Sequence, residues 1–117
     1  MSIERHQGGC HCGAVSFEVN TDIASALRCN CSLCKRKGAV MLAGEEGSFK
    51  LLSGSESVSL YQFNTQVAEH YFCKHCGIYT HHSPRSNPSI CRVNAGCIDA
   101  INIDSLSVGL NDGASFS

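Results

Sequence analysis

The sequence predicts a single β-rich domain built from short strands, with less than a quarter of its residues in helices. Two observations lead to this prediction. Seven or so short runs of apolar or alternating residues are bounded by Gly, Ser, Pro or Asn, and the periodicity of helices is scarce. The chain has 117 residues, enough for one hydrophobic core and too few for two ordinary domains, so residues 1–117 are expected to fold as one unit.

The individual elements follow from these runs. Residues 14–19 and 57–63 alternate apolar and polar side chains, which places one face of each predicted strand on a core. Shorter strands are predicted at residues 39–43, 49–52, 69–72, 78–81 and 90–93. Helix is expected only in a turn or two after Ser32 and around residues 103–106. The small and polar residues 109–117 predict a loosely held tail.

Composition argues against several classes of function. Nine Lys and Arg against ten Asp and Glu give a net charge of -1, which provides no attraction toward nucleic acid or an anionic membrane. No uncharged apolar run approaches the roughly 18 residues of a membrane span, and the N-terminal residues contain no apolar segment of an export signal. We therefore expect a cytoplasmic protein with neither a nucleic-acid nor a membrane partner.

Cysteine is the most informative residue type in the chain. There are nine cysteines, an odd number, and no export signal accompanies them, so metal binding is favoured over a disulfide framework. Five Phe, three Tyr and no Trp leave the core with few large aromatic side chains. A bound metal would help such a small domain to stay folded.

Seven of the nine cysteines fall into three clusters, namely Cys10 with Cys12, then Cys29, Cys31 and Cys34, and finally Cys73 with Cys76. Gly77 follows the last pair, which is typical of a metal-binding turn, because glycine adopts the positive φ that turns backbone N–H groups toward the sulfurs. A redox pair is the alternative reading. Redox C-x-x-C pairs usually begin a helix, however, whereas strand-like residues follow Gly77.

The seven sulfurs divide naturally into four and three, because structural zinc takes four ligands and reactive zinc keeps one position open. The two pairs followed by glycine would form the set of four, which is Cys10, Cys12, Cys73 and Cys76. The set of three is then Cys29, Cys31 and Cys34, the candidate catalytic residues. Spacing alone leaves open the exchange in which Cys31 and Cys34 join the last pair.

Three basic residues, Lys35, Arg36 and Lys37, directly follow the set of three. They could stabilise thiolates or bind the carboxylates of a substrate, and the alternative is a solvated basic turn. Thiolates donate charge to zinc and make it a weak Lewis acid, so chemistry on a thiol at the open position is favoured over hydrolysis by zinc hydroxide.

Four segments, in order along the chain, resemble the motifs of the glutathione-dependent formaldehyde-activating enzyme family, which shares its domain with centromere protein V. They are residues 8–15 (GGCHCGAV), 29–37 (CNCSLCKRK), 72–77 (FCKHCG) and 93–99 (VNAGCID). The match runs from about residue 6 to residue 99, with a compatible pattern of strands between the motifs.

The resemblance implies a β-tent fold of two small sheets, related to zinc-ribbon folds. It also implies a structural zinc on the set of four and a reactive zinc on the set of three. Three exposed thiolates bind a metal less securely than four, so the second site could be partly occupied. The implied activity is that of a carbon–sulfur lyase that joins formaldehyde to glutathione as S-hydroxymethylglutathione. A small thiol and an aldehyde are then the expected partners, the thiol losing its proton at the open zinc position before it adds to the carbonyl.

Two other functions remain as alternatives. One is a non-catalytic zinc-binding module for a protein partner, and the other is a redox or metal-storage protein. Among the remaining residues, Cys91 and Cys97 lie in apolar runs and are expected to pack in the core. His81 and His82 alternate along a strand, so at most one is expected to face the core or a cleft, where it would be a candidate general acid.

Overall fold

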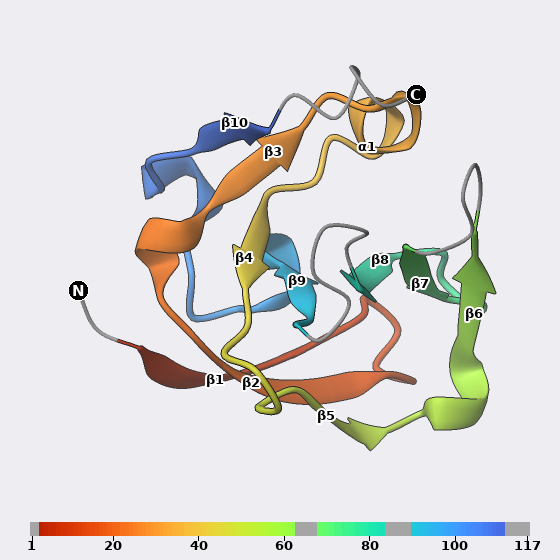
Figure 1. Cartoon of the computed structure of the whole chain (residues 1–117). Helices are drawn as coiled ribbons and strands as arrows, with labels where there is room; N and C mark the ends of the chain where they lie inside the picture. Colours follow the sequence, from red (N-terminus) through yellow and green to blue (C-terminus); the bar gives the residue numbers. More distant parts are fainter. Residues whose placement is uncertain (1–2, 63–67, 84–89, 112–117) are drawn as a thin grey trace.

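The computed structural model describes residues 3–62, 68–83 and 90–111, and its strands form two sheets (Figure 1). This confirms the predicted β-rich fold with little helix. The smaller sheet has the strand order β1-β2-β5 and is antiparallel. Its strands are β1 (Glu4–Gly9), β2 (Ser16–Thr21) and β5 (Lys50–Ser53).

The larger sheet has seven short strands in the order β10-β3-β4-β9-β8-β7-β6. They are β3 (Leu27–Cys29), β4 (Met41–Ala43), β6 (Val58–Tyr61), β7 (Glu69–Cys73), β8 (Tyr79–Ser83), β9 (Arg92–Asn94) and β10 (Gly109–Asn111). Each neighbouring pair is antiparallel except β10 with β3, which is parallel. β8 is therefore a central strand, and four of its five residues are buried.

Helical structure is limited to short pieces. The α-helix α1 (Ser32–Lys37) begins where predicted, after Cys31, and ends at Gly38, whose φ of 64° lets the chain turn away. Single 3-10 turns occur at η1 (Ile23–Ser25), η2 (Ser55–Ser57), η3 (Ala95–Cys97) and η4 (Ile103–Ser105). No helix in the described part of the chain is long and apolar enough to span a membrane.

The hydrophobic core joins the two sheets. β2 contributes Phe17 and Val19 from one side, because its alternating side chains point to a single face. Leu42 of β4 and Val93 of β9 pack against them from the larger sheet, and Ile98 closes the cluster. All five are at most 1% exposed, so the alternation at residues 14–19 identified a core face correctly.

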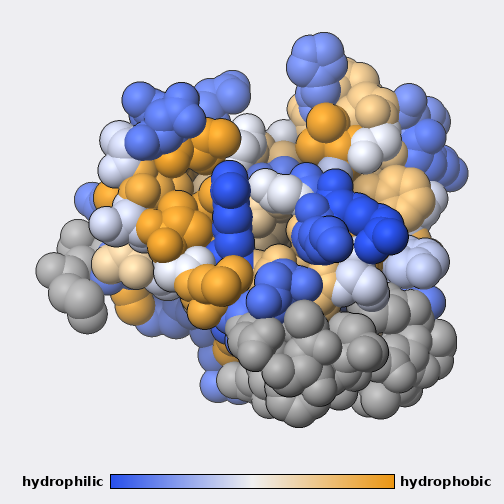
Figure 2. All heavy atoms as spheres, turned by 90° about the horizontal axis from the view of Figure 1, so that it is seen from above, coloured by the Kyte–Doolittle hydropathy of each residue, from blue (hydrophilic) through white to orange (hydrophobic). Residues whose placement is uncertain are grey.

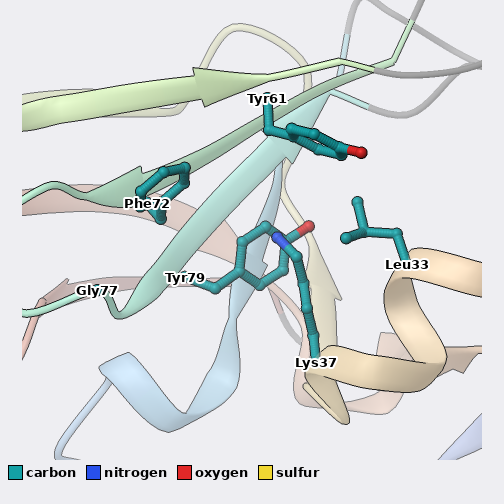
Figure 3. A pocket seen from close by; sticks show the side chains of 6 residues that line it. All are labelled: Leu33, Lys37, Tyr61, Phe72, Gly77 and Tyr79. Atoms are coloured by element: carbon teal, nitrogen blue, oxygen red, sulfur yellow. The ribbon is translucent and has the colours of Figure 1, made fainter.

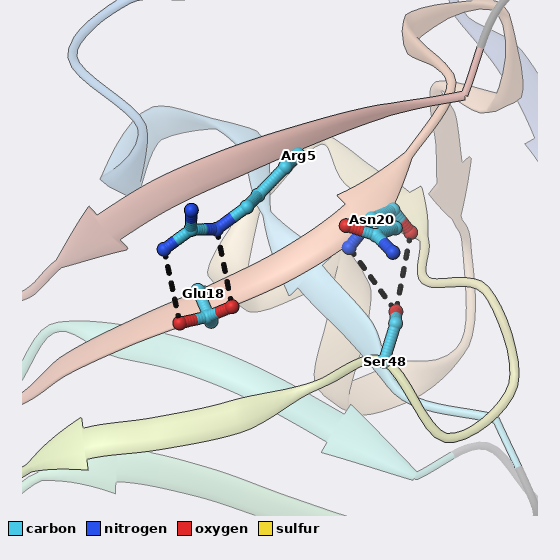
Figure 4. Close-up of polar contacts among 4 residues, drawn as sticks. All are labelled: Arg5, Glu18, Asn20 and Ser48. Carbon is cyan, nitrogen blue, oxygen red and sulfur yellow. Dashed lines mark hydrogen bonds and ion pairs between the residues drawn. The ribbon is translucent and has the colours of Figure 1, made fainter.

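Two polar contacts join neighbouring segments of the smaller sheet at its surface (Figure 4). Arg5 of β1 forms an ion pair with Glu18 of β2, with 3.1 Å between Nε and Oε2. The Ser48 hydroxyl accepts a hydrogen bond from the Asn20 backbone N–H at 3.1 Å, which holds the segment before β5 against β2. The exposed ion pair contributes little to stability.

The tail predicted from residue 109 is wrong at its start, because Gly109–Asn111 form β10 at the edge of the larger sheet. Backbone pairing with β3 holds this strand, and Leu110 is 68% exposed, so no pattern of buried side chains announces it. Seen from above, apolar residues gather on the side of the molecule where β10 lies (Figure 2). The prediction for residues 112–117, like that for Phe63, falls outside the described residues.

Candidate functional site

Four cysteines from two distant turns meet at one point. Cys10 and Cys12 lie in the turn between β1 and β2, whereas Cys73 ends β7 and Cys76 lies in the following turn. All four sulfurs lie within 4.8 Å of one another. Cys12 Sγ is 3.6 Å from Cys10 Sγ and 3.7 Å from Cys73 Sγ. These separations match the edge of roughly 3.8 Å expected for four sulfurs arranged as a tetrahedron around zinc.

Backbone N–H groups face these sulfurs, as in metal-binding turns. The N–H of Val15 donates to Cys10 Sγ at 3.3 Å, and that of His75 donates to Cys73 Sγ at 3.4 Å. Gly77 has a φ of 78°, the positive value predicted for the residue after the second pair. A hydrogen bond from the Ile78 backbone lowers the pKa of the Cys76 thiol to about 6, which favours the thiolate form that metals bind.

A second cluster contains three cysteines and lies at the start of α1. Cys29 ends β3, Cys31 caps the helix with its sulfur, and Cys34 lies in its first turn. Their sulfurs also lie within 4.8 Å of one another. The N–H of Cys34 donates to Cys31 Sγ at 3.3 Å, and the Asn111 side-chain amide donates to Cys29 Sγ at 3.6 Å.

The two thiols on the helix differ in acidity. Burial raises the pKa of Cys31, but hydrogen bonds from the Cys34 backbone and from its thiol neighbours outweigh burial and lower it. Burial raises the pKa of Cys34, and the thiols of Cys31 and Cys29 raise it further. A cation at this cluster would relieve the repulsion that keeps Cys34 protonated.

The donor sets of both clusters suit zinc. All nine cysteines are free, so the close sulfurs do not arise from disulfides. Four sulfurs within 4.8 Å of one another fit a closed structural site, and three sulfurs leave one position for another ligand. The structure brings together the same two sets that the sequence analysis favoured, and Cys31 and Cys34 lie with Cys29 rather than with Cys73 and Cys76.

A cavity of about 300 Å³ borders the helix that carries Cys34 (Figure 3). Leu33 and Lys37 line it from α1, and the facing walls come from the larger sheet. The residues on these walls are Tyr61, Phe72 and Tyr79 from the strands and Gly77 from the turn between β7 and β8. A cavity with aromatic walls and one ammonium group next to a three-sulfur cluster has the composition of a small-molecule site.

The three basic residues predicted beside the cluster have different roles. Lys35 and Arg36 are exposed, and the Arg36 guanidinium donates to the Ser32 carbonyl at 2.7 Å, which fits a solvated turn. Lys37 is half-buried, and its ammonium lies 3.1 Å from the centre of the Tyr79 ring. Burial lowers the pKa of Lys37 to about 8, against the opposing effect of the Cys34 and Cys31 thiols. Within the basic run, Lys37 is thus the residue that reaches the cavity.

Sequence reasoning missed a buried network behind the cavity. The Tyr79 hydroxyl is hydrogen-bonded to Nδ1 of His82 and, at 3.2 Å, to Nδ1 of His70. His70 and His82 are cross-strand partners on β7 and β8. Burial lowers the pKa of His70 to about 4 and that of His82 to about 3, and the nearby Lys37 charge acts in the same direction, so both rings are neutral at pH 7.

A β-bulge places Tyr79 and His82 together. Tyr71 of β7 pairs with His81 of β8, but the next residue, Phe72, pairs with Tyr79. Thr80 is therefore an extra residue in β8. Residues three apart on one strand then share a face, where regular alternation would separate them. Asn94 stabilises the bulge, since its side-chain amide donates to the Tyr79 carbonyl at 2.8 Å.

The expectation that at most one of His81 and His82 faces the interior is wrong. Both are buried, because β8 is a central strand covered on both faces. The His81 ring contacts two aromatic rings, with its centroid 4.7 Å from that of Tyr71 and 4.4 Å from that of Phe49. Only His82 points to the cavity side, where it contacts Tyr79.

The two remaining cysteines lie outside both clusters. Cys97 is buried in the main hydrophobic cluster, and its thiol donates to the Tyr79 carbonyl at 3.5 Å. Cys91 is half-buried, and its thiol faces the Arg92 carbonyl at 3.9 Å. Burial raises the pKa of each thiol to about 12, so both stay protonated at neutral pH.

The chain is similar to known proteins both in sequence and in fold. A Halomonas elongata protein named "Putative glutathione-dependent formaldehyde-activating enzyme" is 34% identical over 80 residues, which cover 60% of this chain and 50% of that protein. The chain thus spans about half the length of this curated relative. A crystal structure of a Rhodobacter sphaeroides protein superimposes with a TM-score of 0.85 at 42% identity, covering 90% of this chain and 99% of the other.

A family model described as glutathione-dependent formaldehyde-activating enzyme matches residues 5–107. The match includes both cysteine clusters and every residue that lines the cavity. The chain therefore belongs to the glutathione-dependent formaldehyde-activating enzyme family, a family of carbon–sulfur lyases.

Proposed function

We propose that the protein catalyses the addition of a small, glutathione-like thiol to formaldehyde or a similar aldehyde, or the reverse reaction. The observation that carries this proposal is the three-cysteine cluster at the start of a helix whose next turn lines a cavity of about 300 Å³. Three sulfur ligands leave one position for a further ligand, whereas the four-cysteine cluster leaves none. Family membership supports the same chemistry.

Cys29, Cys31 and Cys34 would hold the reactive zinc, and Cys10, Cys12, Cys73 and Cys76 the structural zinc. Zinc at the three-cysteine cluster would supply a Lewis acid that makes a neighbouring thiol more acidic. The chain's own residues do the rest. Leu33, Phe72 and Tyr61 provide apolar walls against which the substrate can pack.

Lys37 contributes the positive charge of the cavity. Its ammonium lies at the cavity wall above Tyr79, where it can bind a carboxylate of the thiol substrate. Because the group is half-buried, such an ion pair is stronger than one on the open surface. The thiol is thereby held beside the helix that carries Cys34, with its reactive end near the sulfur cluster.

The test uses protein that contains two zinc ions per chain. Formaldehyde is mixed with glutathione, cysteine or 2-mercaptoethanol, and adduct formation and breakdown are followed by NMR exchange against the uncatalysed rate. We expect acceleration with at least one thiol and its loss in Cys34→Ser. Cys91→Ser is the matched control, because it removes a thiol that lies outside both clusters.

Zinc-loaded protein that accelerates the reaction with none of these thiols, in either direction, would refute the proposed function. A non-catalytic zinc-binding module would then account for the same two clusters. Acceleration that survives Cys34→Ser would instead place the chemistry away from the three-cysteine cluster.

A further inference from the structure

We infer that the Tyr79 hydroxyl donates the proton that the aldehyde oxygen takes up in the proposed reaction, with His70 and His82 as positioning residues that orient it. This inference rests on the proposed function and assigns residues to a step of it. It concerns a different strand from those that carry the three cysteines.

The first argument is the position of the hydroxyl. Tyr79 lines the cavity, and its ring extends from β8 with the hydroxyl directed toward the space between Leu33, Lys37 and Tyr61 (Figure 3). Leu33 and Lys37, from the helix that carries Cys34, line the same cavity as Tyr79. A carbonyl attacked by a thiol near Cys34 would therefore lie beside Tyr79. The hydroxyl therefore sits on a wall where the substrate oxygen can reach it.

The second argument is the hydrogen-bonding capacity of the network. A tyrosine hydroxyl donates one hydrogen bond and can accept two. Two histidine nitrogens, Nδ1 of His70 and Nδ1 of His82, face this single oxygen. When a histidine carries its hydrogen on Nδ1, it donates to the phenol oxygen and stabilises negative charge there. The phenol hydrogen can then turn toward the cavity.

The third argument concerns which group can act as an acid at neutral pH. Burial keeps His70 and His82 neutral, with pKa values lowered to about 4 and about 3, so neither supplies a proton as an imidazolium. Burial and the nearby thiols raise the pKa of Tyr79 above its ordinary value, so it remains protonated. The Lys37 ammonium above the ring stabilises the negative charge that develops when the proton leaves.

The sulfur of the deprotonated thiol forms a bond to the carbonyl carbon, and the π pair of the C=O bond moves to the oxygen, which takes the Tyr79 hydrogen. The tyrosine oxygen then regains a proton from solvent through the cavity, which replaces the proton that it gave and equals the one that the thiol released, while both histidines keep their own hydrogens. The S–H and C=O π bonds are broken and C–S and O–H bonds are formed, with no net oxidation. The reverse reaction follows the same path backward.

Contacts within β8 and from β9 fix the position of Tyr79. The bulge at Thr80 turns Tyr79 and His82 to the same face, and the two rings lie nearly parallel, 9° apart. Asn94 fixes the Tyr79 carbonyl from β9, at 2.8 Å. β-Bulges of this kind commonly direct a side chain into a functional site.

The test compares Tyr79→Phe with Tyr71→Phe in zinc-loaded protein. Each variant removes one tyrosine hydroxyl, and the two tyrosines lie on the neighbouring strands β7 and β8. The Tyr71 hydroxyl donates to Glu69 at 2.9 Å, and Tyr71 does not line the cavity. We expect Tyr79→Phe to lower kcat by about 100-fold or more, with KM changed by less than about threefold, and with unchanged zinc content. Tyr71→Phe should keep the wild-type kcat. A Tyr79→Phe variant with more than a tenth of that kcat overturns the inference.

Two further measurements separate a catalytic network from a merely structural one. His82→Asn keeps a side-chain amide near the position of Nδ1 and should recover part of the kcat lost in His82→Leu, whereas equal losses in both contradict the positioning role. Independently of activity, 15N spectra of the histidine side chains should show the hydrogen on Nδ1 in at least one of His70 and His82. Hydrogen on Nε2 in both rings overturns the inference, because both Nδ1 atoms would then accept the phenol hydrogen and keep it away from the cavity.

The failure of this inference differs from failure of the proposed function. An active wild type together with an active Tyr79→Phe variant refutes the role of Tyr79 alone. An inactive wild type refutes the proposed function, and the catalytic role of Tyr79 falls with it.

Discussion

The sulfurs of Cys12 and Cys73 lie 3.7 Å apart although 61 residues separate them in the sequence. Cys12 belongs to the turn that connects β1 to β2, and Cys73 ends β7 of the larger sheet. The four-cysteine cluster therefore ties the two sheets together at one end, where a bound metal would close a long loop of chain. The three-cysteine cluster spans six residues and closes no such loop.

This difference predicts that the two clusters fail in different ways. Cys73→Ser removes a fully buried ligand whose metal joins the two sheets, so we expect a loss of several kcal/mol of stability and a sharply lower yield of soluble protein. Cys34→Ser should remain folded and lose the second zinc, because that metal is held by one short segment. Thermal unfolding, zinc content and circular dichroism measure the difference.

A matched control is Cys97→Ser, which alters a buried cysteine outside both clusters and should keep two zinc ions per chain. Equal loss of stability in Cys34→Ser and Cys73→Ser would contradict the assignment of structural and reactive sites. So would an unchanged melting temperature after a strong chelator has removed all zinc.

The strands and the two cysteine sets could be predicted because their signals are local. The alternation at residues 14–19 marks a core face, and glycines after Cys12 and Cys76 mark turns that expose N–H groups. β1, β3 and β10 were missed because all three depend on backbone pairing with a neighbour, and none of them contains a fully buried residue. Asn111, which bonds to Cys29, was missed for the same reason.

The Tyr79 network could not be predicted, because it depends on one extra residue in β8. Strict alternation would put Tyr79 with His81 and leave His82 on the opposite face. The bulge at Thr80 reverses this arrangement and places Tyr79 with His82. Asn94, in the last family motif, supports the bulge from β9, because its side-chain amide donates to the Tyr79 carbonyl while its side-chain oxygen caps η3.

Lys37 should determine affinity for anionic thiols. Lys37→Gln is expected to raise KM for glutathione and cysteine by about tenfold or more, because a hydrogen bond between charged groups is lost, and to leave KM for the neutral 2-mercaptoethanol nearly unchanged. Lys35→Gln is the control, since Lys35 is exposed and does not line the cavity. Equal KM values for Lys37→Gln and wild type with every thiol would exclude this role.

The same residue predicts a pH dependence. The pKa of Lys37 is lowered to about 8, so its positive charge is present below that pH and is lost as the pH rises through it. The preference for anionic over neutral thiols, taken as a ratio of KM values, should therefore fall above pH 8. The ratio cancels the ionisation of the thiol itself when thiols of similar pKa are compared. A ratio that stays constant from pH 7 to 9 would contradict this prediction.

Acid should destabilise the fold through its buried histidines. Burial lowers the pKa of His81 to about 4, below the ordinary value of 6.5, so the unfolded chain takes up a proton that the folded chain refuses. Stability is complete above about pH 6.5 and falls as the pH drops toward 4, by about 1.4 kcal/mol for each pH unit from this one residue.

His81→Asn should reduce that dependence. The variant loses ring contacts with Tyr71 and Phe49 at every pH, so the quantity to compare is the change in unfolding free energy between pH 7 and pH 5.5, with zinc content checked at both. We expect the change to be about 1 kcal/mol smaller than in wild type. Identical changes would mean that His81 is not the group that titrates.

Gly54 connects the two halves of the four-cysteine cluster, and its replacement should loosen that site. It has a φ of 85°, and a Cβ at this position would overlap the carbonyl oxygen of Ala14, just after the first cysteine pair. In the turn that begins at Gly54, the Ser57 carbonyl accepts a hydrogen bond from the Lys74 N–H at 2.9 Å, next to the second cysteine pair. Gly54→Ala should cost about 3 kcal/mol or more, from backbone strain and steric overlap together.

Gly47→Ala separates the two causes. Gly47 has a similar φ of 76°, but nothing lies within 4 Å of the position that its Cβ would take, so we expect a loss of only about 1 kcal/mol. Gly54→Ala should in addition release zinc faster to a chelator, because displacement of this turn moves both cysteine pairs, whereas Gly47→Ala should release it at the wild-type rate. Equal stability and equal release rates in the two variants would show that the contact between Gly54 and Ala14 does not hold the cluster together.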